Sequence, residues 1–261
     1  MRKIIDFHAH IFNPKIAHLA VANLEKHYGM PWQCKGTFSD MQEEMEKSHF
    51  YKAVIFSTPT KPTQVEINND FLFDLNDDRF IVFGSVHPDY EDVSGEIRRV
   101  KNHGLRGFKF HPDFQRFNID DDKALFMYDE IGEDYPIVLH TGDEKLDYSS
   151  PERLSKVLEK FPTHKFVAAH MGGYSVWETE AKHLVGKNVW FDTSSTLWRV
   201  KPNELVKMIR AHGADKILFG TDYPAVSLKE EAERIEKLRL TKKEKDAIFY
   251  QNAEKLLGCE L

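Results

Sequence analysis

Histidines and aspartates stand at the carboxyl ends of several short apolar segments of this 261-residue chain. The segments end in His8-Ala9-His10, Lys109-Phe110-His111, His140, His170 and Asp222. Neutral imidazoles and a carboxylate are ligands of catalytic Zn2+, which keeps one coordination position open for water. The ion lowers the pKa of that water to about 7 and so makes hydroxide available at neutral pH. The residue types therefore predict metal-assisted chemistry.

The spacing of His8 and His10 suits a shared ion. Side chains alternate between the two faces of a strand, so residues two apart point the same way. Each histidine taken alone is also compatible with a half-buried imidazole bonded to the backbone. Several imidazoles and a carboxylate gathered at one place would be costly to bury without a cation. We therefore expect these side chains to surround a metal ion.

The segments that carry these residues have the pattern of buried parallel strands. Eight runs, several of them rich in Val, Ile and Phe, alternate with longer charged stretches of helical periodicity. The runs cover Ile4–His8, Ala53–Ser57, Phe80–Val86, Leu105–Phe110, Pro136–His140, Lys165–His170, Val189–Thr193 and Ile217–Thr221. This alternation predicts a single-domain (β/α)8 TIM barrel over residues 1–261, with a doubly wound open sheet as the alternative. Barrel active sites lie at the carboxyl ends of the strands, where the candidate residues stand.

Helix signals separate the runs. Capping side chains or a following proline predict helix starts at Ser39, Ser94, Asp121, Ser150 and Lys201. Two more amphipathic stretches cover Leu228–Leu238 and Lys242–Leu257. The longest insertion, residues 11–38, follows the first run, and we expect it to form a lid over the barrel mouth.

Composition and charge exclude several classes of protein. The net charge is −6 and no long basic run occurs, so nucleic acid is not an expected partner. No stretch of about 18 apolar residues predicts a membrane span. The two cysteines lie far apart without a CxxC pattern, which is typical of free thiols in a reducing compartment. We expect a cytoplasmic protein with a small-molecule substrate, and a homo-oligomer stays open.

Five ordered motifs resemble the amidohydrolase superfamily. They are HAH at 8–10, GFKFHP at 107–112, VLHTG at 138–142, AAHMGG at 168–173 and FGTDYP at 219–224. More narrowly, the pattern resembles the amidohydrolase-related group that contains the carboxymuconate-semialdehyde and resorcylate-type decarboxylases. The resemblance runs over essentially the whole chain. It implies a (β/α)8 barrel whose metal ligands are His8, His10, His140 and Asp222.

The resemblance also implies the chemistry of the site. The ligand set suits Zn2+, with Mn, Fe, Co or Ni as alternatives, and we favour one ion over two. Asp222 would touch the ion and accept a proton from the attacking water. His170 would polarise the substrate carbonyl, act as an acid or base, or ligate a second ion.

Two residues of the fourth run allow two interpretations each. Lys109 resembles the carboxylated bridging lysine of binuclear superfamily members. We favour an unmodified ammonium that binds a substrate carboxylate or pairs with an acidic neighbour, because many relatives in the narrower group look mononuclear. His111 faces the same side as Lys109 and is either a further site residue or a cap on the strand end.

Other residues near the predicted rim are candidates for shaping a pocket. They are Thr58, His87, Thr141, Tyr174, Ser194, Trp198, Arg199 and Tyr223. Arg199 would clamp a substrate carboxylate bidentately or else lie in solvent at a helix start, which we slightly favour. The remaining histidines are interpreted as surface residues: His18, His27, His49, His103, His164, His183 and His212.

Three functions follow from these features. The first is a metal-dependent hydrolase of a small amide, lactone or other ester, which we prefer because the KFHP motif is not usual in the decarboxylases. The second is a metal-dependent non-oxidative decarboxylase of an aromatic or muconate-like acid. The third is a non-catalytic metal-binding protein. The first two would share their ligands, so the ligand set does not separate them.

Overall fold

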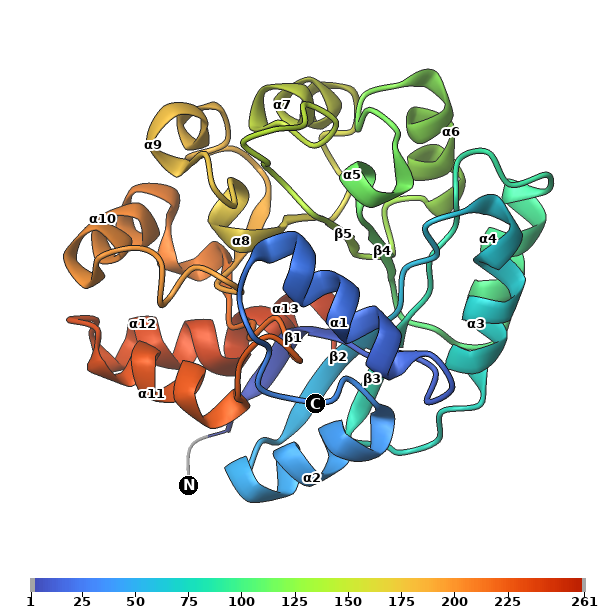
Figure 1. The fold of residues 1–261 in the computed structure, drawn as a ribbon. Helices are drawn as coiled ribbons and strands as arrows, with labels where there is room; N and C mark the ends of the chain where they lie inside the picture. Colours follow the sequence, from blue (N-terminus) through green and yellow to red (C-terminus); the bar gives the residue numbers. More distant parts are fainter. Residues whose placement is uncertain (1–2, 260–261) are drawn as a thin grey trace.

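Eight parallel strands form a barrel that helices surround (Figure 1). The computed structural model describes residues 3–259. The strands are β1 (Ile5–His10), β2 (Lys52–Phe56), β3 (Phe80–Phe83), β4 (Phe108–Phe110), β5 (Ile137–Leu139), β6 (Phe166–Ala168), β7 (Trp190–Asp192) and β8 (Ile217–Leu218). Each overlaps one of the eight predicted runs. The (β/α)8 prediction is therefore confirmed.

Backbone hydrogen bonds close the ring where the two ladders, β1 to β3 and β4 to β8, leave gaps. Between β3 and β4, the Lys109 N–H donates to the Gly84 carbonyl at 2.9 Å. Between β8 and β1, the Asp222 N–H donates to the His8 carbonyl at 2.9 Å. The first and last strands thus lie side by side, and the alternative of an open sheet is wrong.

Apolar side chains fill the barrel and the layer outside it. The inward-facing set is Ile5, Phe7, Val54, Phe56, Ile81, Phe83, Val138, Val167 and Leu218, with Ala253 and Leu256 from the C-terminal helix. The outward-facing set, which includes Ile55, Phe108 and Phe110, packs under the surrounding helices. Both faces are covered, which explains why the strands appear in the sequence as continuous apolar runs.

Helices follow the strands in the predicted order. The longer ones are α1 (Ala17–Tyr28), α2 (Phe38–Ser48), α3 (Val65–Phe73), α4 (Val93–Asn102), α6 (Asp122–Ile131), α7 (Pro151–Lys160), α10 (Pro202–His212) and α11 (Leu228–Lys237). Shorter ones are α5 (Pro112–Gln115), α8 (Ala169–Gly172), α9 (Trp177–Glu180), α12 (Lys242–Asp246) and α13 (Asn252–Leu257). A π-helical segment, Ala247–Gln251, joins α12 to α13.

Two predicted helix starts were late by two residues. Helix α2 is capped by Thr37, whose hydroxyl accepts from the Asp40 N–H, rather than beginning at Ser39. Helix α4 is capped by the Asp92 carboxylate rather than by Ser94. In both cases the earlier side chain has the extended or non-helical backbone that lets it reach the free N–H groups of the first turn.

The insertion after β1 crosses the barrel. Figure 1 shows α1 lying over the central strands, on the side that faces the reader. Its last residue, Tyr28, packs edge-on against Tyr174 at 5.7 Å between ring centroids and also contacts Phe114. These contacts connect the insertion to the loops after β4 and β6.

One histidine interpreted as a surface residue is buried instead. His212 is 6 % exposed and stacks on Phe191 at 3.8 Å between ring centroids. Its Nε2–H donates to the Val189 carbonyl at 2.9 Å, and its Nδ1 accepts from the Gly186 N–H. The prediction failed because α10 turns its last residue inward, where backbone groups satisfy both ring nitrogens.

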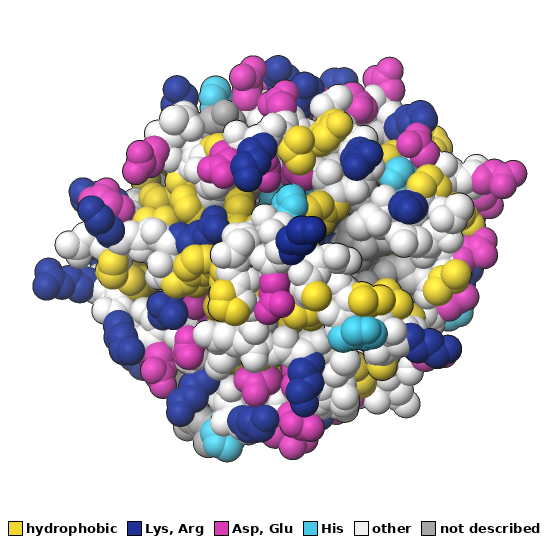
Figure 2. Space-filling model, viewed as in Figure 1, with side chains coloured by type: hydrophobic (Ala, Val, Ile, Leu, Met, Phe, Trp, Pro, Cys, Tyr) yellow, Lys and Arg dark blue, Asp and Glu magenta, His cyan; other side chains and the backbone are white. Residues whose placement is uncertain are grey.

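On the face that carries α1, acidic and basic side chains are interspersed (Figure 2). Of the described helices, none is both long enough and apolar enough to traverse a bilayer.

Candidate metal centre

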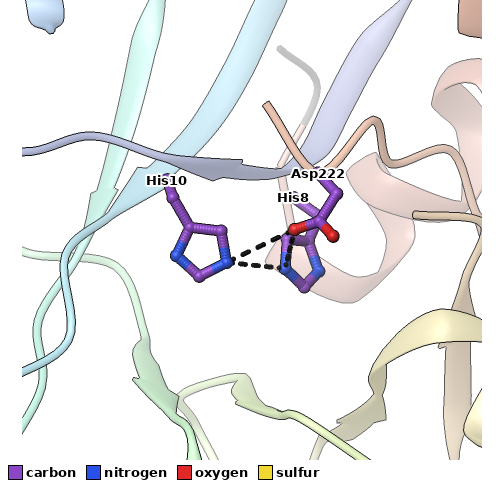
Figure 3. A group of neighbouring side chains, drawn as sticks. All are labelled: His8, His10 and Asp222. Atoms are coloured by element: carbon purple, nitrogen blue, oxygen red, sulfur yellow. Dashed lines mark hydrogen bonds and ion pairs between the residues drawn. The ribbon is translucent and has the colours of Figure 1, made fainter. Parts of the chain in front are cut away.

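Two side chains of the first strand and one from the loop after the last strand converge at the carboxyl end of the barrel (Figure 3). The Nε2 atoms of His8 and His10 lie 3.2 Å apart. Each of them lies 3.4 Å from Asp222 Oδ1. One ion can reach all three atoms, because Zn–N and Zn–O bonds of about 2.0–2.2 Å require donor separations of roughly this size.

The second nitrogen of His8 reveals which nitrogen carries the proton. His8 Nδ1 lies 2.8 Å from a carboxylate oxygen of Asp192, which can only accept a hydrogen bond. Nδ1 is therefore protonated and Nε2 carries a lone pair. That lone pair faces the Asp222 carboxylate without a proton between them, an arrangement that a cation resolves.

The same reasoning applies to the histidines after β5 and β6. His140 Nδ1 and His170 Nε2 are 2.9 Å apart. The opposite nitrogen of each ring faces a carbonyl, that of Gly142 at 3.2 Å and that of Ser194 at 3.1 Å. Both carbonyls accept, so the two facing nitrogens each present a lone pair. Two lone pairs at this distance also suit a shared cation.

Lys109 lies under this group. Its side chain is fully buried, and Nζ is 3.4 Å from His8 Nε2. Among residues 3–259 no carboxylate lies within ion-pair distance of it. Burial lowers the pKa of Lys109 to about 8. The interpretation of Lys109 as an ammonium paired with an acidic neighbour thus finds no such neighbour here.

Burial keeps the imidazoles neutral. It lowers the pKa of His8, and it lowers the pKa of His170 to about 4. For His140, burial and the neighbouring His111 hold the pKa well below its usual range. Burial acts to raise the pKa of Asp222, but the surrounding imidazoles hold it well below its ordinary value. Neutral histidines and an ionised carboxylate are the protonation states that ligate metals.

The backbone around these residues is unusual. Asp222 has φ 66° and His170 has φ 58°, a region that residues other than glycine rarely adopt. Asp222 also accepts a hydrogen bond from the Ser195 hydroxyl, which orients its second oxygen. Backbone strain of this kind persists where the surrounding structure enforces it and is common at functional sites.

A second group of potential ligands lies beside the first. One ligand atom each of His111, Asp113 and His140 lie within 4.8 Å of one another, and all three residues are buried. The His111 ring stacks on His140 at 3.9 Å between centroids, while its Nδ1 accepts from the Phe114 N–H at the start of α5. His111 therefore caps helix α5, which follows the strand, while its role as a further site residue stays a prediction.

An aromatic and cationic rim covers His140 and His170. The Tyr174 ring lies 5.5 Å and 5.3 Å from their rings, between centroids. The Arg199 guanidinium lies over Tyr174 at 4.3 Å and is only partly exposed. No carboxylate of the described chain lies within ion-pair distance of it. Binding of an anion by Arg199 therefore stays a prediction, as does the alternative of a solvated arginine.

Other rim candidates differ in their availability. Thr58 Oγ1 and Trp198 Nε1 are buried without a hydrogen-bond partner among the described residues. Thr141 is bonded to the Leu139 carbonyl, and His87 Nδ1 accepts from the Asp89 N–H. The Tyr223 hydroxyl donates to Asp40, away from the metal ligands, so it does not line a pocket as expected.

Sequence reasoning missed Asp192, Asp113 and Ser195. Asp192 ends the seventh strand in the run Phe191-Asp192-Thr193, at the same height as the recognised residues. A buried carboxylate at the end of a barrel strand is the signal that identifies it. Asp113 stands in the four-residue helix α5 and Ser195 in a turn, both too short for a periodicity that predicts their direction.

Comparisons with known proteins agree on one family and fold. A family model described as "Amidohydrolase" matches residues 5–259. No curated protein matches the sequence. Solved structures with the same fold include a 2,6-dihydroxybenzoate decarboxylase from Rhizobium, at 16 % identity, a TM-score of 0.76 and 99 % coverage of both chains.

Two further solved structures have the same fold. A 5-carboxyvanillate decarboxylase from Novosphingobium aromaticivorans with bound manganese has 16 % identity and a TM-score of 0.74, covering 98 % of this chain and 97 % of that one. An uncharacterised TIM-barrel protein from Bordetella bronchiseptica has 20 % identity and a TM-score of 0.77, with 98 % coverage of both.

Proposed function

The chain belongs to the amidohydrolase family and is a metal-dependent enzyme of that superfamily, and we propose that it decarboxylates a small aromatic or muconate-like acid. This reverses the order expected from the sequence, in which hydrolysis came first. The reversal is supported by the structural neighbours, several of which are decarboxylases of aromatic acids.

The convergence of lone pairs carries the proposal of a metal. His8 and Asp222 face each other without a proton between them, and so do His140 and His170. We propose one divalent ion held by His8, His10 and Asp222, with His140 as the fourth donor. Zn2+ suits this mixed nitrogen and oxygen set, and Mn2+ is supported by the manganese-bound neighbours.

The ion would supply a Lewis acid that polarises substrate oxygens and lowers the pKa of water. Arg199 would bind the substrate carboxylate through its guanidinium, which contacts Tyr174 but pairs with no carboxylate of the described residues. Decarboxylation breaks the bond between the ring carbon and the carboxylate, which leaves as CO2. The electron pair stays on the carbon, which takes a proton that His170 or Asp222 would relay from a water molecule in the site. The insertion at 11–38 would cover this site and exclude bulk water.

Hydrolysis is the second candidate, and one observation favours it. Asp222 directs Oδ1 toward the two histidines while Ser195 holds its other oxygen. This geometry suits a carboxylate that accepts a proton from water as the water attacks a carbonyl. The substrate would then be an amide, a lactone or another ester, as the family's description suggests.

A substrate panel separates the two reactions. The chain, loaded separately with Zn2+ and Mn2+, is assayed against hydroxybenzoates, muconate-like acids, lactones and amides. We expect CO2 release from at least one aromatic or unsaturated acid. His8→Ala serves as the blank. Turnover of lactones or amides alone would contradict decarboxylation, and full activity in His8→Ala would contradict the proposed ligands.

A further inference from the structure

Asp192, at the end of β7, is fully buried and accepts four hydrogen bonds. Its Oδ2 accepts from His8 Nδ1 at 2.8 Å. Its Oδ1 accepts from the Ser194 hydroxyl and from the backbone N–H groups of His170 and Ser194, both at 3.1 Å. None of its partners is Lys or Arg. All four hydrogen bonds of the carboxylate thus come from the two histidines and from Ser194.

Ser194 connects Asp192 to the His170 ring by hydrogen bonds. Ser194 Oγ donates to Asp192, so it accepts from His170 Nδ1, which lies 2.8 Å away. The Ser194 carbonyl lies 3.1 Å from the same nitrogen and also accepts. The proton of His170 is therefore held on Nδ1, as in His8. Both rings consequently present Nε2 lone pairs to the centre of the barrel.

We propose that Asp192 is a positioning residue that fixes the Nδ1–H tautomer of His8 directly and that of His170 through Ser194. Asp192 thereby leaves Nε2 of His8 free to bind the ion and Nε2 of His170 free to act as a base or, when protonated, as an acid. The inference rests on the proposed metal site, because only Nε2 of His8 faces His10 and Asp222. Carboxylates bonded to the outer nitrogen of a ligating histidine orient the ring and raise its basicity.

Asp192→Asn tests this with a change of two atoms. The asparagine oxygen will occupy the Oδ1 position, where three donors converge, so its NH2 group will face His8 Nδ1. Because an NH2 group only donates, we expect Nδ1 to accept from it and the His8 proton to move to Nε2. The Ser194 hydroxyl, which lies 3.1 Å from His8 Nδ1, would then no longer accept from this ring. His8 then has no lone pair on the side of the proposed ion.

Asp6→Asn is the matched control. Asp6 is equally buried on β1, and its Oδ1 accepts from the backbone N–H groups of His8 and Thr221. Its Oδ2 accepts from the Thr221 hydroxyl. A hydroxyl can exchange donor and acceptor roles, whereas an imidazole does so only by moving its proton. This control reproduces the buried carboxylate-to-amide change without touching a ring.

Nitrogen-15 NMR of the histidines in the metal-free protein reads the tautomer directly. We expect the Nδ1–H form for His8 in the wild type, assigned by comparison with His8→Gln. Asp192→Asn should convert it to the Nε2–H form, and Asp6→Asn should not. A wild-type His8 protonated on Nε2 would overturn the proposal even if no variant could be prepared.

Metal affinity, measured by chelator competition with Zn2+, is the second readout. We expect Asp192→Asn to weaken Zn2+ binding by roughly 10–100-fold and Asp6→Asn by less than about 3-fold. If both variants lost the same amount of Zn2+ affinity, Asp192 would have only a structural role, which would contradict the proposal. Neither measurement involves a substrate. If the decarboxylase assay fails, the proposed role of Asp192 is unaffected. If the tautomer of His8 is wrong, the decarboxylase assay can still be interpreted.

Discussion

His140 Nδ1 and His170 Nε2 face each other at 2.9 Å while their outer nitrogens are bound to carbonyl oxygens. The two residues end neighbouring strands, and neither lies near the ends of the chain. Their facing lone pairs repel unless a proton or a cation lies between them. This pair is therefore a sensitive point at which to test for a metal.

Replacing His140 should abolish much of the metal affinity. We expect His140→Ala to lose more than the roughly 10–100-fold that removal of an outer partner costs. In the wild type, ion at 100 times its Kd should raise the free energy of unfolding by about 2.7 kcal/mol. Calorimetry with and without ion measures both effects. His103→Ala, at an exposed helix end, should retain the full metal-induced shift in Tm.

Lys109 tests the number of ions. If it is an unmodified ammonium, elemental analysis of the loaded protein should give one ion per chain. Lys109→Met should lower kcat/KM at least 10-fold, yet stabilise the metal-free protein by about 1–3 kcal/mol, because it removes an unpaired buried charge. Two ions in the wild type and one in the variant would instead indicate a carboxylated, bridging lysine.

Gly142, after His140, touches the backbone after His170. A Cβ there would lie 2.7 Å from the carbonyl carbon of Gly173, and its φ is 87°. Gly142→Ala should therefore destabilise the fold by more than backbone strain alone and lower metal affinity. Gly132→Ala, with φ 74° and open space around it, reports the strain alone, about 1 kcal/mol. Urea unfolding of both variants gives the difference, and equal losses would contradict a close contact between these strand ends.

His212 predicts a pH dependence of stability. Burial lowers its pKa to about 4, against about 6.5 in the unfolded chain. Between these two pKa values the unfolded state binds a proton that the folded state does not. The contribution of neutral His212 to the free energy of unfolding is therefore complete above pH 6.5 and is lost as the pH falls toward 4. Two and a half pKa units correspond to about 3 kcal/mol. His212→Phe keeps the stack on Phe191 without titrating, so its unfolding free energy should fall by that much less between pH 7 and pH 4.

Arg199 should recognise the charge of the substrate. A charge-assisted hydrogen bond contributes about 1.5–3 kcal/mol, so Arg199→Met should reduce kcat/KM for a carboxylate substrate by roughly 10–100-fold. Arg199→Lys should recover only part of the loss, because an ammonium lacks the planar fork. The methyl ester of the same acid, tested as a competitive inhibitor, should bind both proteins equally well. A change in its affinity would indicate that Arg199 only supports Tyr174.

The sequence predicts the barrel well because its strands are covered on both faces and separated by clear helix signals. It also predicts that His8, His10 and Asp222 come together, as the structure shows, since strand ends meet at one edge of a barrel. The wrong predictions concern where individual side chains point, which depends on tertiary packing. His212 turns inward at the end of a helix, and the Tyr223 hydroxyl turns toward Asp40 instead of the mouth.

Asp192 escaped notice for a different reason. Its role depends on a 2.8 Å contact with a residue 184 positions earlier in the chain. Neither residue type nor spacing specifies which imidazole a buried carboxylate meets. The contact between His8 and Asp192 can be recognised only in the closed barrel, where the first and seventh strands are placed relative to each other.

The closing contact between β8 and β1 has a consequence for biosynthesis. Asp222 leaves the ribosome more than two hundred residues after its partner His8. A nascent chain that lacks the last strand therefore has no complete pocket for an ion. Acquisition of the metal should therefore follow synthesis of the last strand.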